Sequence, residues 1–216
     1  MPKTDSVLQK DVMEELVWDP SVGRAEIGVA ARDSVVTLSG EVDSYAQKLA
    51  AMNAAERVSG VRAVADDISI KVPAPFKRSD MDIAHAVANA LHWDIEVPDG
   101  KVKARVDSGW VTLDGEVEWD FQRSAATRAV RYLTGVTGVS NMVKIRKLAW
   151  APEVKGRIEG ALKRMADADA SHITVLANDG VVTLKGCVHS WSARQDAENA
   201  AWAAPGVTTV KDELVV

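Results

Sequence analysis

The chain is dominated by an internal repeat. The phrase Val-Thr-Leu-x-Gly occurs three times, ending at Gly40, Gly115 and Gly186, so that successive copies are almost evenly spaced. A Gly-Val pair follows each of them at the same distance, at Gly60, Gly135 and Gly206. Self-similarity at a nearly constant spacing is typical of repeated structural units. The sequence therefore predicts three copies of one small domain, with boundaries at 1–73, 79–147 and 152–216.

Each copy has about 70 residues, which is near the lower limit for a domain that folds alone. The hydrophobic content of 47% is ordinary for a soluble globular protein. The single cysteine excludes an internal disulfide framework. The two linkers, 72–78 and 147–152, contain proline and an aromatic residue, so we expect them to be short and semi-rigid.

Hydrophobic spacing in the first copy predicts a helix over 5–17, strands over 26–30 and 35–42, a helix over 44–59 and a strand over 63–72. Because a helix connects the second and third strands, these two strands should run parallel. The fold class is therefore α+β: three tandem αββαβ domains, each a three-stranded mixed sheet packed on two helices. Both helices should lie on one face of the sheet.

Local signals support these elements. Val36 and Leu38 alternate on one face of the predicted second strand, and Ser44 with Gln47 fits a capping box at the second helix. Trp18 and Trp93 occupy equivalent positions in two copies, which favours a packing role for both. The six landmark glycines are predicted to be structural residues: Gly40, Gly60, Gly115, Gly135, Gly186 and Gly206.

The repeat resembles the BON domain. The resemblance rests on the helix–strand–strand–helix–strand order, the Val-Thr-Leu-x-Gly-x-Val phrase and the Gly-Val-x-x-Val phrase, and it covers nearly the whole chain. It implies a bacterial, non-enzymatic module that is associated with osmotic or envelope stress and contacts phospholipid membranes or other envelope components. It also implies that the glycines named above are structural positions.

The familiar members of this family are periplasmic or outer-membrane lipoproteins. The first twenty residues of this chain include Asp5, Lys10 and Asp11 and show no secretory signal. We therefore expect a cytoplasmic protein, with a periplasmic one as the alternative.

No catalytic or cofactor-binding motif is evident. The sequence lacks a glycine-rich phosphate loop and a His-Glu-x-x-His motif, so we expect neither an enzyme nor a cofactor. Cys187, His189 and His172 suggest a zinc site, because thiolate and imidazole suit zinc. The favoured interpretation is a buried thiol beside an ordinary surface histidine, and no metal site is assigned.

Two carboxylate pairs, Asp66-Asp67 and Asp212-Glu213, lie in the last strands of the first and third copies. They could coordinate a cation. The favoured interpretation is that they are solvated charges that discourage pairing between strand edges.

The net charge of the chain limits the classes of partner that it is expected to bind. The net charge is −5. Residues 1–73 carry 8 basic and 12 acidic side chains, residues 74–147 carry 11 and 10, and residues 148–216 carry 7 and 9. Such an acidic chain is a poor candidate for nucleic-acid binding, which requires many cations.

The second copy alone has a non-negative charge, and its second helix is the candidate lipid-binding site. Arg123, Arg128 and Arg131 lie within an arc of about 140° on the helix, and Trp119 and Phe121 lie at its start. A basic helix with aromatic residues suits an anionic membrane surface. The ordinary alternative is a solvated helix face, because three acidic residues dilute the patch.

We therefore predict a non-catalytic, stress-associated binding protein whose partner is an anionic phospholipid surface or an envelope-linked protein. One alternative is a cytoplasmic protein-interaction scaffold or chaperone-like module that uses the exposed sheet faces. Another is a module that senses a small ligand or a cation. Self-association is left open.

Overall fold

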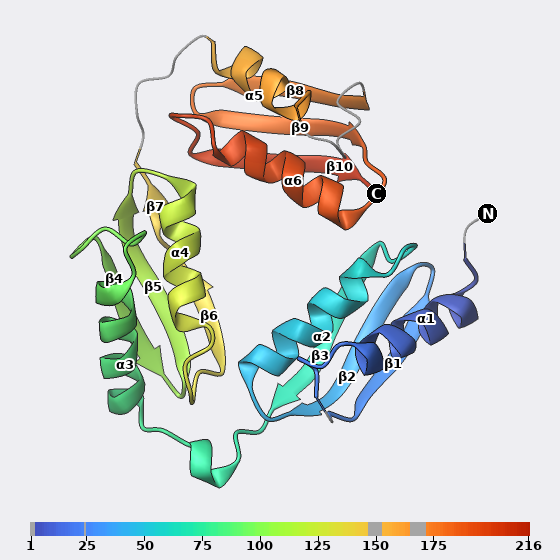
Figure 1. Cartoon of the computed structure of the whole chain (residues 1–216), viewed down its shortest axis with the longest axis vertical. Coiled ribbons are helices and arrows are strands. Elements are labelled where there is room, and N and C mark those ends of the chain that lie inside the picture. The colour runs from blue at the N-terminus through green and yellow to red at the C-terminus, as the bar shows by residue number, and fades with distance from the viewer. Residues whose placement is uncertain (1–2, 24, 147–152, 165–171) are drawn as a thin grey trace. The chain divides into compact units, whose positions relative to one another are not determined.

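The computed structural model describes residues 3–23, 25–146, 153–164 and 172–216. In the first repeat the chain forms a helix, a two-stranded hairpin, a second helix and a third strand (Figure 1). These elements are α1 Asp5–Trp18, β1 Ile27–Arg32, β2 Val35–Val42, α2 Tyr45–Arg57 and β3 Ala63–Ile70. The order and the approximate bounds agree with the prediction. The second linker, including Trp150 and Pro152, lies outside the described residues.

The same order recurs twice (Figure 1). After a short 3-10 helix, η1 Ala74–Phe76, the second repeat contains α3 Asp80–Trp93, β4 Val102–Asp107, β5 Trp110–Val117, α4 Asp120–Val130, β6 Gly138–Asn141 and β7 Lys144–Ile145. The third contains α5 Val154–Leu162, β8 Ile173–Asn178, β9 Val181–Cys187, α6 Trp191–Trp202 and β10 Thr209–Val215. Three tandem αββαβ units are therefore present, as predicted.

The strand that carries the repeated phrase is central in each sheet. β2 pairs antiparallel with β1 and parallel with β3. β9 pairs in the same way with β8 and β10. In the second repeat β5 lies between β4 and β6 and pairs in parallel with β7. The prediction of mixed sheets is confirmed. The parallel pairing arises because the crossover helix returns the chain to the same end of the sheet before the third strand begins.

One element differs from the prediction. The last strand of the second repeat is divided into β6 and β7. At the division the side-chain oxygen of Asn141 accepts a hydrogen bond from the N–H of Val143 at 3.0 Å. The N–H of Met142 still donates to the carbonyl of Leu113 on β5 at 2.8 Å. The chain therefore stays on the sheet through the interruption.

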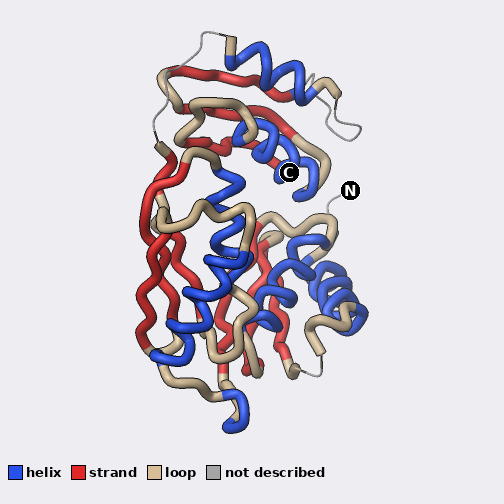
Figure 2. Tube along the Cα trace, turned by 60° about the vertical axis from the view of Figure 1, so that its left-hand side comes forward, coloured by secondary structure: helices blue, strands red, loops and turns tan. Residues whose placement is uncertain are grey.

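The core of each repeat lies between the sheet and its two helices (Figures 1 and 2). In β2, Val36 and Leu38 are fully buried, as their alternation predicts. The helical residues that pack in the same cluster are Leu8, Val12, Leu16, Ala51, Ala54 and Ala55. Because apolar side chains fill only this side, the opposite face of the sheet carries exposed or half-buried side chains. The threonine of the repeated phrase faces that open side in every copy.

Each hairpin turn uses two residues with positive φ. In the first repeat these are Asp33 and Ser34, at φ 52° and 66°, as a type I′ turn requires. The carboxylate of Asp5, in the first turn of α1, accepts hydrogen bonds from both turn N–H groups at 3.1 and 3.4 Å. Asp80 makes the equivalent two contacts in the second repeat, both at 2.8 Å. In these two repeats, hydrogen bonds thus connect the start of the first helix to the turn of the hairpin.

Polar side chains also fix the helix ends. Ser44 caps α2 by accepting from the N–H of Gln47, and Gln47 accepts from the N–H of Asp43 at 2.9 Å. Arg57, near the end of α2, donates to Asp19 at 2.7 Å, so the C-terminal ends of the two helices are tied together. The hydrogen bond from Arg57, followed by the one from the Ser21 N–H, lowers the pKa of the Asp19 carboxyl below its usual value.

Candidate functional site

The candidate lipid-binding residues lie on α4 and on the turn that precedes it, except Arg131, which directly follows the last residue of the helix, Val130. The side chain of Gln122 accepts hydrogen bonds from the N–H groups of Glu118 and Trp119, at 3.0 and 3.1 Å. It therefore orders the start of the helix, as Gln47 does in the first repeat. Trp119 is half-buried, whereas Phe121 is 51% exposed. Phe121 is thus the more accessible of the two aromatic residues.

Two of the three candidate arginines pair with carboxylates. Arg123 lies 2.5 Å from Asp120, one turn earlier on the same helix. Arg128 forms an ion pair with Glu96. The guanidinium of Arg131 lies 4.7 Å from the ring centroid of the next residue, a cation–π distance. These contacts reduce the positive charge that α4 presents to a ligand.

The position of Arg123 has a structural role in the other repeats. The residues at the corresponding positions of the first and third copies are Lys48 and Arg194. Lys48 pairs with Asp66 at 2.8 Å and Arg194 pairs with Asp212 at 2.5 Å. All four of these side chains are partly buried, with exposed fractions between 15% and 28%. Each pair therefore connects the second helix of its repeat to the third strand.

These ion pairs correct the interpretation of the acidic residues. Asp66 and Asp212 are not solvated edge charges, because each is paired and also accepts a hydrogen bond from the N–H two residues further along its strand, at 3.1 and 2.9 Å. In the second repeat the strand residue is Asn141, whose amide donates to the Arg123 carbonyl and to Thr127, both at 2.7 Å. The equivalent positions of these helix and strand residues in the three copies are the sequence signal that could have revealed the pairing.

The glycines that end the repeated phrase lie where the backbone allows no side chain. Gly40, Gly115 and Gly186 have φ values of 135°, 144° and 134°. A Cβ atom would lie 2.4, 2.0 and 1.8 Å, respectively, from the carbonyl oxygen of the residue just before the neighbouring strand, which is Glu26, Lys101 or His172. The Gly-Val glycines, Gly60, Gly135 and Gly206, also have positive φ values, of 99°, 91° and 82°. This geometry gives a physical reason for the predicted structural role.

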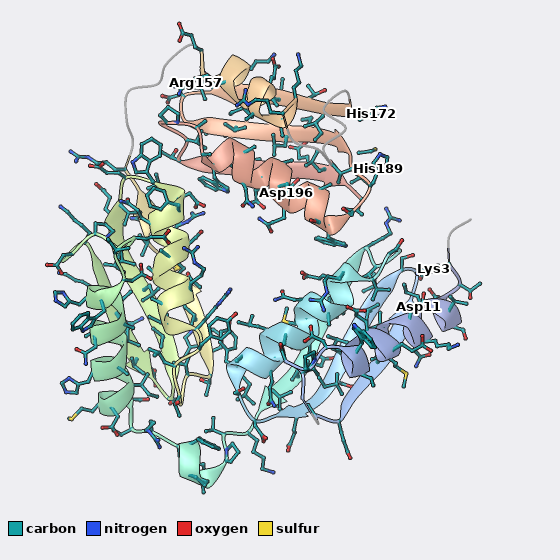
Figure 3. All side chains as sticks on the ribbon, viewed as in Figure 1. Lys3, Asp11, Arg157, His172, His189 and Asp196 are labelled. Carbon is teal, nitrogen blue, oxygen red and sulfur yellow. The ribbon has the colours of Figure 1, made fainter. Side chains whose placement is uncertain are left out.

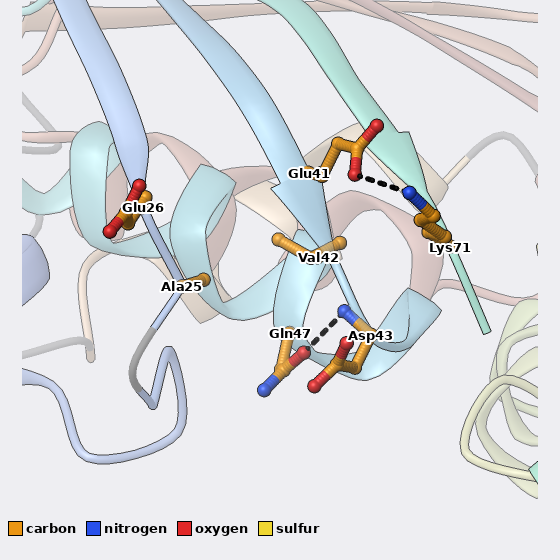
Figure 4. A pocket seen from close by; sticks show the side chains of 7 residues that line it. All are labelled: Ala25, Glu26, Glu41, Val42, Asp43, Gln47 and Lys71. Carbon is orange, nitrogen blue, oxygen red and sulfur yellow. Dashed lines mark hydrogen bonds and ion pairs between the residues drawn. The ribbon is translucent and has the colours of Figure 1, made fainter. Parts of the chain in front are cut away.

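A polar pocket of about 470 Å³ lies at one end of the first sheet (Figure 4). Its wall contains the carboxylates of Glu26, Glu41 and Asp43. Glu41 is paired with Lys71 at 3.4 Å, and the Asp43 backbone is held by Gln47. The pocket is therefore a solvated notch whose charges are partly balanced within the repeat.

The residues that were considered for a zinc site, but not assigned to one, lie in the third repeat. His172 precedes β8 and His189 follows β9 (Figure 3). Cys187, the last residue of β9, is exposed, so the expectation of a buried thiol was wrong. Its strand ends at the surface, where the thiol projects toward the open side of the sheet. Within the described ranges, no group of three His, Cys, Asp or Glu side chains is arranged to hold a metal ion.

Two tryptophans at the ends of first helices are strongly exposed. Trp18 and Trp93 are 83% and 84% exposed, so the predicted packing role is wrong for both. Their neighbours Val17 and Ile95 are 87% and 100% exposed. On α1 a shallow groove of about 670 Å³ runs past Trp18, Val17 and Met13. The sequence equivalence was real, but it marks a shared surface feature.

The three repeats match a known family model. The model of the BON domain matches residues 4–72, 79–147 and 152–216. The chain belongs to the BON domain family. Osmotically-inducible protein Y of Escherichia coli (strain K12) is 31% identical in an alignment of 143 residues, which covers 62% of this chain and 71% of that protein. Among the described residues, no helix is both long enough and apolar enough to span a membrane.

Solved structures offer only distant likenesses. CdsD, a structural protein of the type III secretion system of Chlamydia trachomatis, aligns over 97% of this chain and 91% of its own at 15% identity, with a TM-score of 0.27. A structure described as its C-terminal domain aligns over 100% and 99% at 14% identity, also with a TM-score of 0.27. Scores this low carry no argument about this chain.

Proposed function

We propose that this BON-family chain is a non-catalytic, stress-associated protein that binds the surface of anionic phospholipid membranes. Stress association is supported by family membership and by the name of its relative, osmotically-inducible protein Y. A non-catalytic role is supported by the contacts of the acidic residues that the sequence offered as a possible ligand site. Asp66 and Asp212 hold a helix to a strand, which is a structural task.

One observation carries the membrane proposal. The first helices of two repeats each end in a strongly exposed tryptophan, beside another strongly exposed apolar residue. Leaving so much apolar surface in water is unfavourable. Tryptophan is enriched at membrane–water interfaces, where its ring is partly buried and its N–H stays hydrated. Trp18 and Trp93 are therefore the proposed anchors.

The candidate site on α4 would add electrostatic attraction. It comprises Trp119, Phe121, Arg123, Arg128 and Arg131. Because two of the arginines already pair with carboxylates, we expect a smaller contribution from them than the roughly 1 kcal/mol that a free basic residue adds near an anionic surface. Binding should therefore depend on salt only moderately, and more on the exposed tryptophans.

Vesicle flotation tests this proposal. The full chain is mixed with vesicles of phosphatidylcholine alone, or with a share of phosphatidylglycerol, at low and moderate salt. We expect wild type to float with the anionic vesicles. A Trp18→Ala, Trp93→Ala double variant should lose most of this binding. A variant with Arg123, Arg128 and Arg131 all changed to glutamine should lose part of it.

The matched control is Trp110→Val. Trp110 is also an exposed tryptophan, at 48%, but it lies on a sheet face, and the other repeats carry valine at its position. This variant should float like wild type. Failure of wild type to float on either vesicle would contradict the proposal and favour a protein-interaction scaffold. Equal losses in the control and the double variant would contradict the choice of anchors.

A further inference from the structure

The second repeat holds a tryptophan flat against its sheet. Trp110 is the first residue of β5 and faces the side of the sheet opposite the helices. A Cβ atom built on Gly138 of β6 would lie 2.3 Å from a carbon of the Trp110 ring, so the ring covers Gly138 closely. The indole N–H donates to the hydroxyl of Ser140 at 3.0 Å. The ring is therefore fixed in orientation, with its outer face open to solvent.

The other two repeats build the same sheet without this arrangement. The corresponding residues pair directly across the strands: Val35 with Ala63, and Val181 with Thr209. Glycine within a strand weakens it, because it has no side chain to pack and a larger entropy to lose. An aromatic ring over the glycine offsets that cost, but the fold requires neither residue. The pair therefore stabilises its own strand, and it also leaves the outer face of the ring available for binding.

The form of the surface limits what can bind. Because the indole N–H is already satisfied by Ser140, the ring offers only its apolar face. Around it the open side of the sheet is polar, with Arg105 and Asp107 exposed on β4 and the Thr112 hydroxyl half-buried on β5. Arg105 supplies donors, Asp107 supplies acceptors and the hydroxyls supply both. The apolar surface that Trp110 offers is the exposed face of a single indole side chain.

We propose that Trp110 is a stacking platform for one pyranose ring of a glycan. One face of a pyranose in its chair form carries axial C–H bonds, whose slightly positive hydrogens fit the negative face of an indole ring. The hydroxyls at its rim point outward, where Arg105, Asp107 and Thr112 can bond to them. A protein partner would be expected to require a larger apolar centre, since stable interfaces bury on the order of 1,000 Å² or more.

Nuclear magnetic resonance of the full chain tests the proposal. The probes are two soluble tetrasaccharides, one of β-1,4-linked N-acetylglucosamine and one of β-1,4-linked glucose, each raised to about 10 mM to detect weak binding. The indole N–H signal of Trp110 is identified by its loss in Trp110→Val. We expect at least one probe to shift this signal saturably, and the signal of Trp93 to remain unchanged.

Variants then distinguish stacking from incidental contact. Trp110→Val should weaken binding at least about fivefold, by analogy with the lower end of the stacking of a nucleic-acid base on an aromatic side chain. It should keep the fold, since valine occupies this position twice elsewhere. Gly138→Ala keeps the indole but lifts it from the sheet, so it should also weaken binding. Trp93→Ala, the control, should bind as wild type does.

Two results would overturn the proposal. One is that neither tetrasaccharide shifts the Trp110 signal. The other is that Trp110→Val, shown to be folded by its thermal melt, binds a probe as tightly as wild type. Neither result bears on vesicle binding, because the proposed lipid anchors are different residues.

Discussion

The requirement for glycine at Gly115 can be measured against a glycine elsewhere in the same repeat. Gly115 has a φ of +144°, and an added Cβ would lie 2.0 Å from the carbonyl oxygen of Lys101. Gly100 also has a positive φ, of +68°, but an added Cβ would meet nothing within 4 Å. Gly115→Ala and Gly100→Ala therefore both impose an unfavourable backbone conformation, and only the first adds a collision.

The expected costs follow from this difference. A non-glycine residue at positive φ costs about 1–2 kcal/mol, of which the lower entropy of the unfolded alanine chain returns about 0.5 kcal/mol. Gly100→Ala should thus lose about 1 kcal/mol. In Gly115→Ala the start of β4 must also move, and the hydrogen bond from the N–H of Glu116 to Lys101 is lost. We expect a total of at least about 3 kcal/mol.

This loss is large for the unit concerned, since a repeat of this size is expected to have a stability of about 4–10 kcal/mol. Urea unfolding followed by the amide signals of β5 would report on the second repeat alone. Gly115→Ala should unfold at a clearly lower urea concentration than Gly100→Ala. If the two variants agree to within about 0.5 kcal/mol, which is the usual effect of a surface substitution, the collision is not what selects glycine.

Three further predictions concern stability. The lowered pKa of Asp19 means that its contribution is present above its unfolded value near 3.8 and is lost as the pH falls through the folded value. The destabilisation caused by Arg57→Gln should therefore be larger at pH 6 than at pH 2, as measured by urea midpoints. Asp212→Asn, which removes the partner of Arg194 but keeps a strand acceptor, should cost about 1–3 kcal/mol in thermal or urea unfolding. Gly156 lies within α5, and an added Cβ would meet nothing within 4 Å. Gly156→Ala should therefore stabilise the protein by about 0.5–1 kcal/mol, which would be measured as a higher melting temperature.

The order of helices and strands could be predicted well from the sequence, because local residue patterns specify it. Val36 and Leu38 alternate with polar residues, and both are fully buried. Ser44 caps α2 as its spacing to Gln47 predicts. The crossover helix dictated the parallel pairing of β2 and β3. Three copies of the same pattern made each assignment more secure, since an accidental periodicity would not recur twice at equivalent positions.

The surface was harder to predict, because its partners come from distant parts of the chain. From the sequence alone, Asp66 is interpreted as a solvated charge at the edge of a strand. Its partner, Lys48, comes close to it only when the chain is folded. Trp18 and Trp93 occupy equivalent positions in two repeats, which suggested a packing role, yet each follows the last buried residue of its helix and is exposed. The sequence places three arginines on one side of a helix. In the structure Arg131 follows the end of α4, and nearby acidic residues pair with the other two.

The repeats supply an internal standard for separating fold from function. Where all three copies share a feature, such as the glycine that ends the repeated phrase, the common fold is a sufficient reason for it. Where the copies differ, the common fold does not require the feature. Trp110 over Gly138 is one such difference, since the corresponding pairs are ordinary strand residues. The tryptophans at the helix ends are a second one, since the first two repeats share them and the third carries Arg164 at that position. Binding is therefore best sought in the features by which the copies differ.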